Sequence, residues 1–437
     1  MARRLTVVVV AAGMVAAEMV TGSSTVGARA GVPRPPDVDG AGSGERPDAR
    51  ATALAPSGTI GKLRFTSTSR LAPGVVFRTF STTGTGGTVR GDLLTVDLAS
   101  PGVTVGLLHP PDVAARRTVS AMAKAQKALA GINGDFFNVT ETHPGVTPTG
   151  SSSGPEIDDG HPLKGAVPNG QRFGPALPPG RSAEDVIGVG TDNRGHLGRL
   201  RLTGTVQSDG TRITLRGLNQ YALPVGGVGA FTGEWGGVSR HRAVCGTDET
   251  RSDPCTTDTT EVTVKKGVVA KVTREVGEGT IPNDTTVLVG REKGADALSA
   301  LRPGDRVRIA YGFTSPRDFR FAIGGFPILR DGEPLDGLDP RGPAPRTAAG
   351  VSGNGRQLLL AVADGRSERS AGLTVAELAS LMDKAGADGA VNLDGGGSSA
   401  FVTRSGGKMV VRNSPSDGRE RAVANGIGVF ANDEDAS

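Results

Sequence analysis

The stretch GAVNLDGGGSSAFV, residues 389–402, joins two apolar runs through one aspartate, three glycines and two serines. Apolar runs bounded by glycine and serine are typical of buried strands connected by a turn. Asp394 directly follows the first run, so the strand would fix its position while the loop after it opens to a ligand. We therefore expect a strand, a turn and a second strand, with a functional carboxylate where the first strand ends.

The turn itself has the composition of an anion-binding loop. Gly395, Gly396 and Gly397 carry no side chains, so a ligand could approach the backbone closely, and successive N–H groups could form a nest for an anion. Ser398 and Ser399 add hydroxyl donors. A wide turn that uses glycine only for its dihedral angles fits the same residues, and both interpretations stay open at this stage.

Two more carboxylates and one cation stand in similar places. Asp135 follows GING, and Asp364 follows the apolar run LLLAVA. Each could instead cap a loop through an Asx-turn. Arg346 precedes small residues in PRTAAG, so its guanidinium could enter a cleft and bind phosphate through two hydrogen bonds, although a surface arginine fits equally well.

The rest of the chain predicts an α+β fold with a curved mixed β-sheet core and few helices. Alternating apolar patterns predict strands from residue 58 onwards, and helices are expected over 118–130 and from Thr374, where Thr374 and Glu377 form a capping box, to Gly386. Residues 138–180 are expected to be a long loop. Short strands and frequent turns predict a β-rich middle section over about 185–315.

The termini carry targeting and linker signals. Residues 1–30 have two arginines, an apolar stretch and a small-residue ARA site, as secretory signal peptides do, although an uncleaved membrane anchor is the alternative. Residues 31–57 are rich in Pro and Gly and predict a disordered linker. We expect a secreted protein with one domain over 58–432, an acidic tail over 433–437, and no membrane association after signal cleavage.

Composition narrows the chemistry further. Cys245 and Cys255 are close in sequence, which predicts a local disulfide in an exported protein; a zinc pair is the rival, but no nearby His or third Cys completes a site. The net charge of +4 is spread over residues of both signs, without a basic block interleaved with aromatics, so nucleic-acid binding is not expected. The five His show no metal-binding spacing.

The chain resembles the phosphodiester glycosidase family in an ordered set of motifs. These are INGDFF (132–137), GGFPIL (324–329), RTAAG (346–350), VADGR (362–366), GLTVAELASLM (372–382), VNLDGGGSSAFV (391–402) and RAVANGIGVF (421–430). The family more often has Gly-Gly or Gly-Ser where this chain has Gly134 and Asp135. The resemblance covers roughly residues 58–432.

The resemblance implies hydrolysis of a sugar-1-phosphodiester on the glycosidic side, which releases free sugar and a phosphomonoester. Asp394 or Asp364 would be the nucleophile or the base that activates water, Arg346 would neutralise the diester, and Asp135 is a further catalytic candidate. Asn133 and Asn392 could orient sugar hydroxyls or cap turns. Gly325 and residues 395–399 complete the expected binding surface for a glycan or glycosyl-phosphate substrate.

Two other functions remain open from the sequence. One is a non-catalytic glycan-binding or cell-wall-binding protein that retains the cleft. The other is a metal-dependent phosphodiesterase, in which Asp364 and Asp394 would hold a divalent cation through oxygen ligands. No cofactor is otherwise expected.

Overall fold

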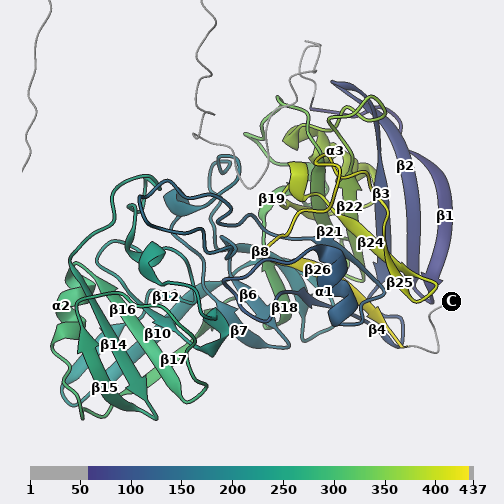
Figure 1. Ribbon diagram of the computed structural model, residues 1–437. Helices are drawn as coiled ribbons and strands as arrows, with labels where there is room; N and C mark the ends of the chain where they lie inside the picture. The colour runs from purple at the N-terminus through teal and green to yellow at the C-terminus, as the bar shows by residue number, and fades with distance from the viewer. Residues whose placement is uncertain (1–57, 433–437) are drawn as a thin grey trace, which may run out of the picture. The chain divides into compact units, whose positions relative to one another are not determined.

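The structure is a computed structural model that describes residues 58–432 (Figure 1). The predicted signal peptide, linker and acidic tail lie outside this range. The described residues form five β-sheets and three α-helices. The candidate site residues belong to three of these sheets.

The largest sheet has eight strands, and all of its neighbouring strands pair antiparallel. Its order from one edge to the other is β1 (Arg64–Ala72), β2 (Val75–Gly84), β3 (Gly87–Asp97), β22 (Gln357–Ala363), β21 (Arg346–Val351), β23 (Gly389–Asn392), β19 (Phe326–Arg330) and β20 (Glu333–Pro334). The central strands β21, β22 and β23 are almost wholly buried, which explains their continuous apolar sequences.

A second sheet of five strands packs against one face of the first. Its order is β25 (Lys408–Val411), β24 (Phe401–Ser405), β5 (Ala130–Asn133), β26 (Gly426–Ala431) and β4 (Val103–Leu108). The rings of Phe77 and Phe401 meet between the two sheets, with their centroids 5.4 Å apart. Figure 1 shows the C-terminal strands β24 and β26 near β4, and β26 pairs with β4 and β5, so this sheet brings the last strand of the described chain next to strands from its first third.

A third sheet of five strands, a fourth of five and a fifth of three contain all the remaining strands of the described residues. The third sheet is β7 (His161–Lys164), β6 (Glu156–Asp158), β18 (Phe319–Gly324), β8 (Asp185–Gly190) and β9 (Gly195–Arg199). The middle section forms β12 (Gly217–Leu218), β13 (Val228–Phe231), β16 (Thr285–Arg291), β14 (Thr259–Lys265) and β15 (Val268–Thr273), and separately β11 (Thr211–Thr214), β10 (Arg201–Ser208) and β17 (Arg308–Thr314). These last two sheets share an apolar cluster of their own.

Helices cover individual sheets, and short 3-10 turns mark the loops. The α-helices are α1 (Val119–Ala125), α2 (Lys293–Ser299) and α3 (Val375–Lys384); the 3-10 turns are η1 (Asn169–Gln171), η2 (Gly233–Trp235), η3 (His241–Val244) and η4 (Gly396–Ser398). Helix α3 has the predicted capping box of Thr374 and Glu377, and it ends before Gly386, whose φ of 98° favours glycine. A Cβ at Gly350 of β21 would lie 2.7 Å from the Met382 side chain, so α3 covers the face of the large sheet toward which Gly350 points.

The expected α+β class, rich in strands and poor in helices, is confirmed. Four details differ. The eight-stranded sheet is antiparallel rather than mixed, because each strand runs opposite to its neighbours in the sheet. Helix α2 lies in the middle section expected to be all β, and strands β6 and β7 lie in the stretch expected to be a loop. Helix α1 is shorter than 118–130, because the chain leaves helical geometry by Lys127, with a φ of 60°.

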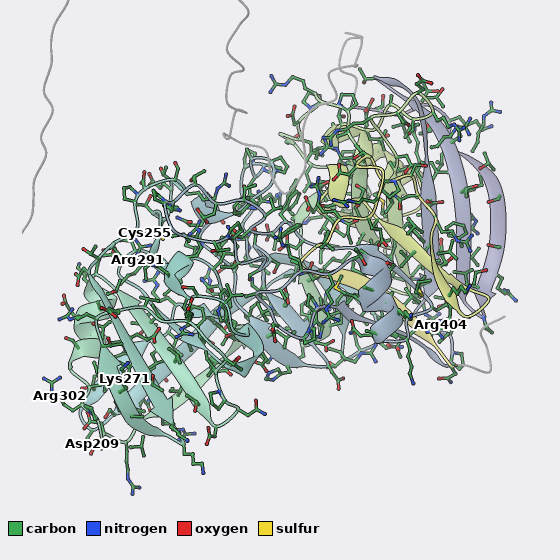
Figure 2. All side chains as sticks on the ribbon, in the orientation of Figure 1. Asp209, Cys255, Lys271, Arg291, Arg302 and Arg404 are labelled. Atoms are coloured by element: carbon green, nitrogen blue, oxygen red, sulfur yellow. A yellow bond between two sulfur atoms is a disulfide. The ribbon has the colours of Figure 1, made fainter. Side chains whose placement is uncertain are left out.

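The predicted disulfide is present between Cys245 and Cys255. Figure 2 labels Cys255 and Arg291, and Arg291 Nη2 donates to the carbonyl of Gly246 at 2.9 Å, so the bridged loop is tied to strand β16. His143 lies close to both sulfurs, but these are bonded to each other and so are not thiolate ligands for a metal. No helix within residues 58–432 is long and apolar enough to span a membrane.

Candidate active site

Asp394 lies where the ends of β23 and β5 meet. The β21–β23 pairing, in which Asn392 faces Ala348, continues one residue further through the Leu393 N–H, which donates to Thr347. The Asp394 N–H then donates to the Gly134 carbonyl at 2.9 Å. The side chain is 1 % exposed. Two sheets therefore fix the backbone of this aspartate from both sides.

Asn133, the last residue of β5, holds this junction together. Its Nδ2 donates to the Asp394 carbonyl at 2.6 Å, while its Oδ1 accepts from the Thr347 hydroxyl at 2.8 Å and from the Ala400 N–H at 3.0 Å. The carboxamide is thus committed to three protein groups. These bonds give Asn133 a role in fixing the backbone of Asp394. Contact of Asn133 with a sugar hydroxyl remains an untested prediction.

Asp135 is enclosed by backbone. Its two oxygens accept from the Phe136 N–H at 2.8 Å and the Gly154 N–H at 2.5 Å. A Cβ at Gly324 would lie 2.5 Å from Oδ2, so the close approach of β18 requires glycine. Burial raises the pKa of Asp135, and the Gly154 N–H, Arg172 and Lys164 oppose that rise. The carboxyl group is therefore a fixed acceptor and a neighbour of two cations.

One of these cations, Lys164, is 0 % exposed. Its Nζ donates to the carbonyl of Gly154, the residue whose N–H binds Asp135. Burial lowers the pKa of Lys164 to about 8, while Glu156 and Asp135 act in the opposite direction. The lysine thereby supports the peptide unit that holds the Asp135 carboxylate.

Asn425, in the RAVAN motif, ties the same group to the last strand. Its Oδ1 accepts from the Asp135 N–H at 2.8 Å, and its Nδ2 donates to Glu156 Oε1 at 2.8 Å. A Cβ at Gly134 would lie 2.3 Å from this Oδ1. Residues 290 positions apart are thus joined directly.

Arg172 is a site residue that the sequence interpretation missed. It is 8 % exposed, and its guanidinium carbon lies 5.0 Å from the ring centroid of Phe136 and 5.5 Å from that of Phe326. Burial lowers the pKa of Arg172, whereas Asp135 and Asp394 both raise it. Arg172 therefore lies in the electrostatic reach of both carboxylates. It stands in the loop NGQRFGP, which has no apolar run or motif to single it out.

Asn392 is 0 % exposed, and neither its Oδ1 nor its Nδ2 has a hydrogen-bond partner within residues 58–432. Its paired neighbours in the sheet are Ala348 of β21 and Phe326 of β19. Because directly paired residues share a face, and side chains alternate along a strand, Asn392 and Arg346 leave the sheet on the same side. A buried carboxamide without partners is costly, so its retention marks this end of β23 as a functional candidate.

Arg346 is buried and anchored to backbone. Its Nε donates to the Leu373 carbonyl at 2.8 Å and its Nη2 to the Gly342 carbonyl at 3.0 Å. Burial lowers the pKa of Arg346 to about 9, nearby Arg366 lowers it further, and Glu377 opposes both. The half-buried Arg366 thus adds a second positive charge within electrostatic reach of the buried Arg346, and such a pair favours a bound anion, which keeps the predicted phosphate contact open.

The glycine-rich turn is more compact than a nest. Its N–H groups donate within the protein: Gly396 to Pro345 at 2.8 Å, Ser398 to Gly395 at 3.1 Å and Ser399 to Gly396 at 3.2 Å. Because these three N–H groups already donate to protein carbonyls, they do not form a row of open donors for an anion. Binding of substrate by residues 395–399 stays a prediction that would have to use their other groups.

Gly397 and Gly325 are required for close packing. A Cβ at Gly397 would lie 2.2 Å from the guanidinium of Arg421, which is ion-paired with Asp417. A Cβ at Gly325 would lie 2.9 Å from the Leu393 side chain, next to Asp394. Both glycines thus let another element approach the turn, and the predicted contact of Gly325 with substrate is untested.

Asp364 has a different set of neighbours from Asp394. Its Oδ1 accepts from the Ser414 N–H at 2.8 Å. Burial raises the pKa of Asp364 to about 6, against hydrogen bonds from Ser414 and Asn413. Asp92, a buried residue of β3 that the sequence interpretation missed, has its pKa raised to about 7 by burial and by Asp364, with Arg412 opposing. The only sequence signal for Asp92 is an acid inside a predicted strand.

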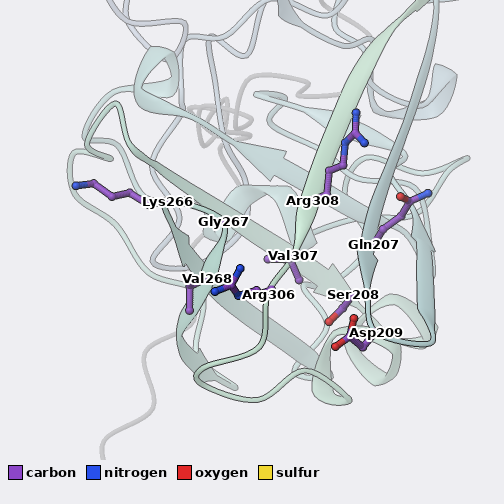
Figure 3. A pocket seen from close by; sticks show the side chains of 9 residues that line it. All are labelled: Gln207, Ser208, Asp209, Lys266, Gly267, Val268, Arg306, Val307 and Arg308. Atoms are coloured by element: carbon purple, nitrogen blue, oxygen red, sulfur yellow. The ribbon is translucent and has the colours of Figure 1, made fainter.

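A separate hollow of about 600 Å³ lies in the middle section (Figure 3). Its lining includes Lys266, Arg306 and Arg308, whose side chains point in different directions in Figure 3. Another hollow, of about 590 Å³, is lined by residues of the segment 169–181 together with Asp248 and Glu249, and it includes Arg172. Only the second of these two hollows shares a lining residue, Arg172, with the candidate site.

Known proteins resemble parts of this chain. The family model described as phosphodiester glycosidase matches residues 258–430, which contain Arg346, Asp364, Asn392 and Asp394. The SPbeta prophage-derived protein YomE of Bacillus subtilis strain 168 is 33 % identical over 153 residues, which is 35 % of this chain and 22 % of that protein. The chain therefore matches only about a fifth of the length of this relative.

Solved structures resemble it over a longer stretch. A hypothetical protein from Synechocystis superposes with a TM-score of 0.63 at 20 % identity, over 84 % of this chain and 64 % of that one. A Burkholderia pseudomallei K96243 protein, whose description suggests export, gives 0.62 at 25 % identity over 80 % and 75 %. The zebrafish N-acetylglucosamine-1-phosphodiester alpha-N-acetylglucosaminidase catalytic domain gives 0.40 at 17 % identity over 86 % and 89 %, a likeness too distant to bear on the site. The phosphodiester glycosidase model thus matches the C-terminal region of this chain, residues 258–430.

Proposed function

We propose that the protein is a secreted hydrolase that cleaves the glycosidic bond of sugar-1-phosphodiesters in surface or extracellular glycans. The observation that carries the proposal is the convergence of Asp135 and Arg172 with Asp394, which lies inside the region matched by the family model. A carboxylate beside a buried cation suits a substrate that is both a sugar and an anion.

The reaction would transfer the glycosyl group to water. An oxygen of water forms a bond to C1 of the sugar, the C1–O bond to phosphorus breaks, and that oxygen leaves with its electron pair on the phosphomonoester. Asp394 would either attack C1 first or accept the proton of the attacking water. A phosphomonoester is a good leaving group, so the demand for a strong general acid is smaller than in ordinary glycosidases.

The two other predicted groups have supporting roles in this proposal. Arg346, with Arg366 beside it, would neutralise negative charge near the turn 395–399. Asp364 would be the second carboxyl group, acting from the face of the large sheet opposite to Arg346, and its charge raises the pKa of its neighbour Asp92. Because the pKa of Asp364 is raised to about 6, it could exchange a proton near neutral pH.

Secretion is part of the proposal for two reasons. The Cys245–Cys255 disulfide is of a kind that persists in oxidising compartments, and one structural neighbour is described as exported. The predicted signal peptide would supply the route.

Product identity is the test. The protein would be incubated with a panel of sugar-1-phosphate methyl diesters, α-glucosamine-type donors included, and the products separated by chromatography. With the reaction run in H₂¹⁸O, free sugar and unlabelled methyl phosphate support the proposal, whereas label in methyl phosphate would mean that water attacked phosphorus. Sugar 1-phosphate and methanol would instead indicate cleavage on the phosphorus side, and saturable binding to polysaccharide without any product would indicate a binding protein.

A further inference from the structure

The guanidinium of Arg172 is buried but makes few hydrogen bonds. It is 8 % exposed, and within residues 58–432 its side chain has one hydrogen-bond acceptor, the Pro175 carbonyl, 2.6 Å from Nη1. A guanidinium carries five N–H donors. The edge formed by Nε and Nη2 therefore has no acceptor in the described part of the chain.

The neighbours of Arg172 fix the plane of this group without occupying that edge. Phe136 and Phe326 stack on each other with their ring centroids 6.0 Å apart, and the guanidinium lies over both rings. Such contact orients a planar cation while leaving its N–H groups free to bind in the plane. The Arg172 carbonyl accepts from Arg251 Nη1 at 2.8 Å, which also holds the backbone in place.

The nearby carboxylates balance the charge of Arg172 but do not hydrogen-bond to it. The oxygens of Asp135 are directed to the N–H groups of Phe136 and Gly154. Asp394 acts on Arg172 through its charge. With Lys164, Glu156 and Arg251 included, the group has three cations and three carboxyl groups. The formal charges balance, so binding of an anion would depend on hydrogen bonds from the open edge of Arg172 rather than on an excess of positive charge.

Arg172 also lines a hollow that does not include Asp394 in its lining. The hollow of about 590 Å³ is walled by Pro175, Leu177, Pro179 and Arg181 among others, with Asp248 and Glu249. A ligand phosphate on Arg172 would thus have an open, partly apolar space next to it.

We propose that the Nε and Nη2 edge of Arg172 binds the phosphate of the substrate diester, with the sugar directed to Asp394 and the alcohol of the diester in the hollow lined by residues 169–181. This inference rests on the proposed function for its orientation of the substrate. It assigns anion recognition to a residue outside the family-matched region, on a loop that precedes the middle section.

Dimethyl phosphate tests the inference, because it is a singly charged diester with no sugar. In the wild-type protein it should raise the melting temperature and inhibit sugar release competitively. Arg172→Met should weaken its affinity at least tenfold and raise KM for the sugar diester by about 10- to 100-fold. Arg172→Lys should give a smaller loss, since lysine keeps the charge but not the planar fork.

Arg181→Met is the matched control. It removes the same charge from the same hollow, and dimethyl phosphate should still bind with near wild-type affinity. Equal losses in the two methionine variants would mean that general charge, rather than the Arg172 edge, attracts the anion, and would overturn the inference. Unchanged affinity in folded Arg172→Met would overturn it as well. If Arg172→Met does not fold, Arg172→Lys decides by the same readout.

The two proposals fail in different ways. Binding of dimethyl phosphate that depends on Arg172, in a protein that releases no sugar from any diester, would leave the anion site standing and remove the proposed function. Sugar release by the wild-type protein, combined with affinity for dimethyl phosphate that does not depend on Arg172, would remove the inference alone.

Discussion

Asp364 and Asp394 start from the same local pattern, an apolar strand followed by aspartate and glycine, and they reach different surroundings. Asp394 is buried near a cation that stacks on two aromatic rings. Asp364 is half-buried, close to a second carboxyl group, and has its pKa raised to about 6. The alternation of side chains explains the difference, because Ala363 pairs with Arg346 and therefore shares its face, whereas the next residue points to the other.

A motif at a strand end therefore locates a carboxyl group but does not determine its protonation state, which depends on the neighbouring residues. The partners of Asp394 come from β5 and the loop at Arg172, and those of Asp364 come from β3 and the segment after β25. Each set is distant in sequence. The two aspartates should therefore respond differently to substitution, in turnover and in the pH dependence of stability.

The largest expected effect is on turnover. Asp394→Asn should lower kcat for sugar release by about 10³-fold or more, because it removes the carboxylate next to the reacting carbon. Asp364→Asn should lower kcat by roughly 10- to 100-fold, since it removes a group assigned to proton exchange. Steady-state kinetics on one diester compares them, with circular dichroism as the check on folding. A larger loss for Asp364→Asn would reverse the assignment of the two roles.

A smaller effect is expected on the pH dependence of stability. The pKa of Asp92 is raised to about 7 in the folded state from its ordinary value of 3.8, so between about pH 4 and 7 the folded state binds more protons than the unfolded state. The contribution of the Asp92 carboxyl group to the free energy of unfolding is therefore greatest at low pH and is lost as the pH rises through 7. Asp92→Asn should remove this loss and stabilise the protein at pH 8 by on the order of 3 kcal/mol relative to wild type.

Urea unfolding at pH 4.5 and pH 8 measures this difference. The gain from Asp92→Asn should shrink or vanish at pH 4.5, where wild-type Asp92 is already protonated. Equal stabilities of the two proteins at both pH values would show that the pKa of Asp92 is not raised in the folded state.

The smallest effect is expected from substitution of Asn392, whose carboxamide has no hydrogen-bond partner within residues 58–432. Asn392→Leu replaces two unsatisfied polar atoms by apolar groups of similar shape, so the free energy of unfolding should rise by about 1 kcal/mol while sugar release falls. Opposite signs in the two measurements would identify a group kept for function at a cost in stability. A variant that loses stability and keeps activity would assign Asn392 to packing on the Asp394 side of the sheet.

Much of the fold could be predicted from the sequence because its signals are local. The capping box of Thr374 and Glu377, the stop at Gly386 and the strand before Asp394 all depend on neighbouring residues, and each is confirmed. Helix α2 was missed because its seven residues are too few to show an amphipathic period. Strands β6 and β7 were missed because their stretch is rich in glycine, proline and serine and has no periodicity.

The partners within the site were harder to predict, because they depend on residues brought together from distant segments. Asp135 and Asp394 could be selected from strand ends, but Arg172 belongs to a loop whose composition indicates only a turn. Asp92 and Lys164 gain their perturbed pKa values from burial, which a sequence pattern does not reveal. The glycines at 324 and 397 were visible as small residues, whereas the side chains that occupy their space were not.

The large sequence separation of the contacts within the site also affects when the site can form during folding. Asn133 binds the backbone of Asp394 across 261 residues, and Asp135 binds Asn425 across 290. Contacts of such separation are slow to form, since a long loop must close before they stabilise anything. A growing chain released before residue 425 would lack one wall of the Asp135 pocket. Activity should thus appear in a single late step of folding, after synthesis is complete.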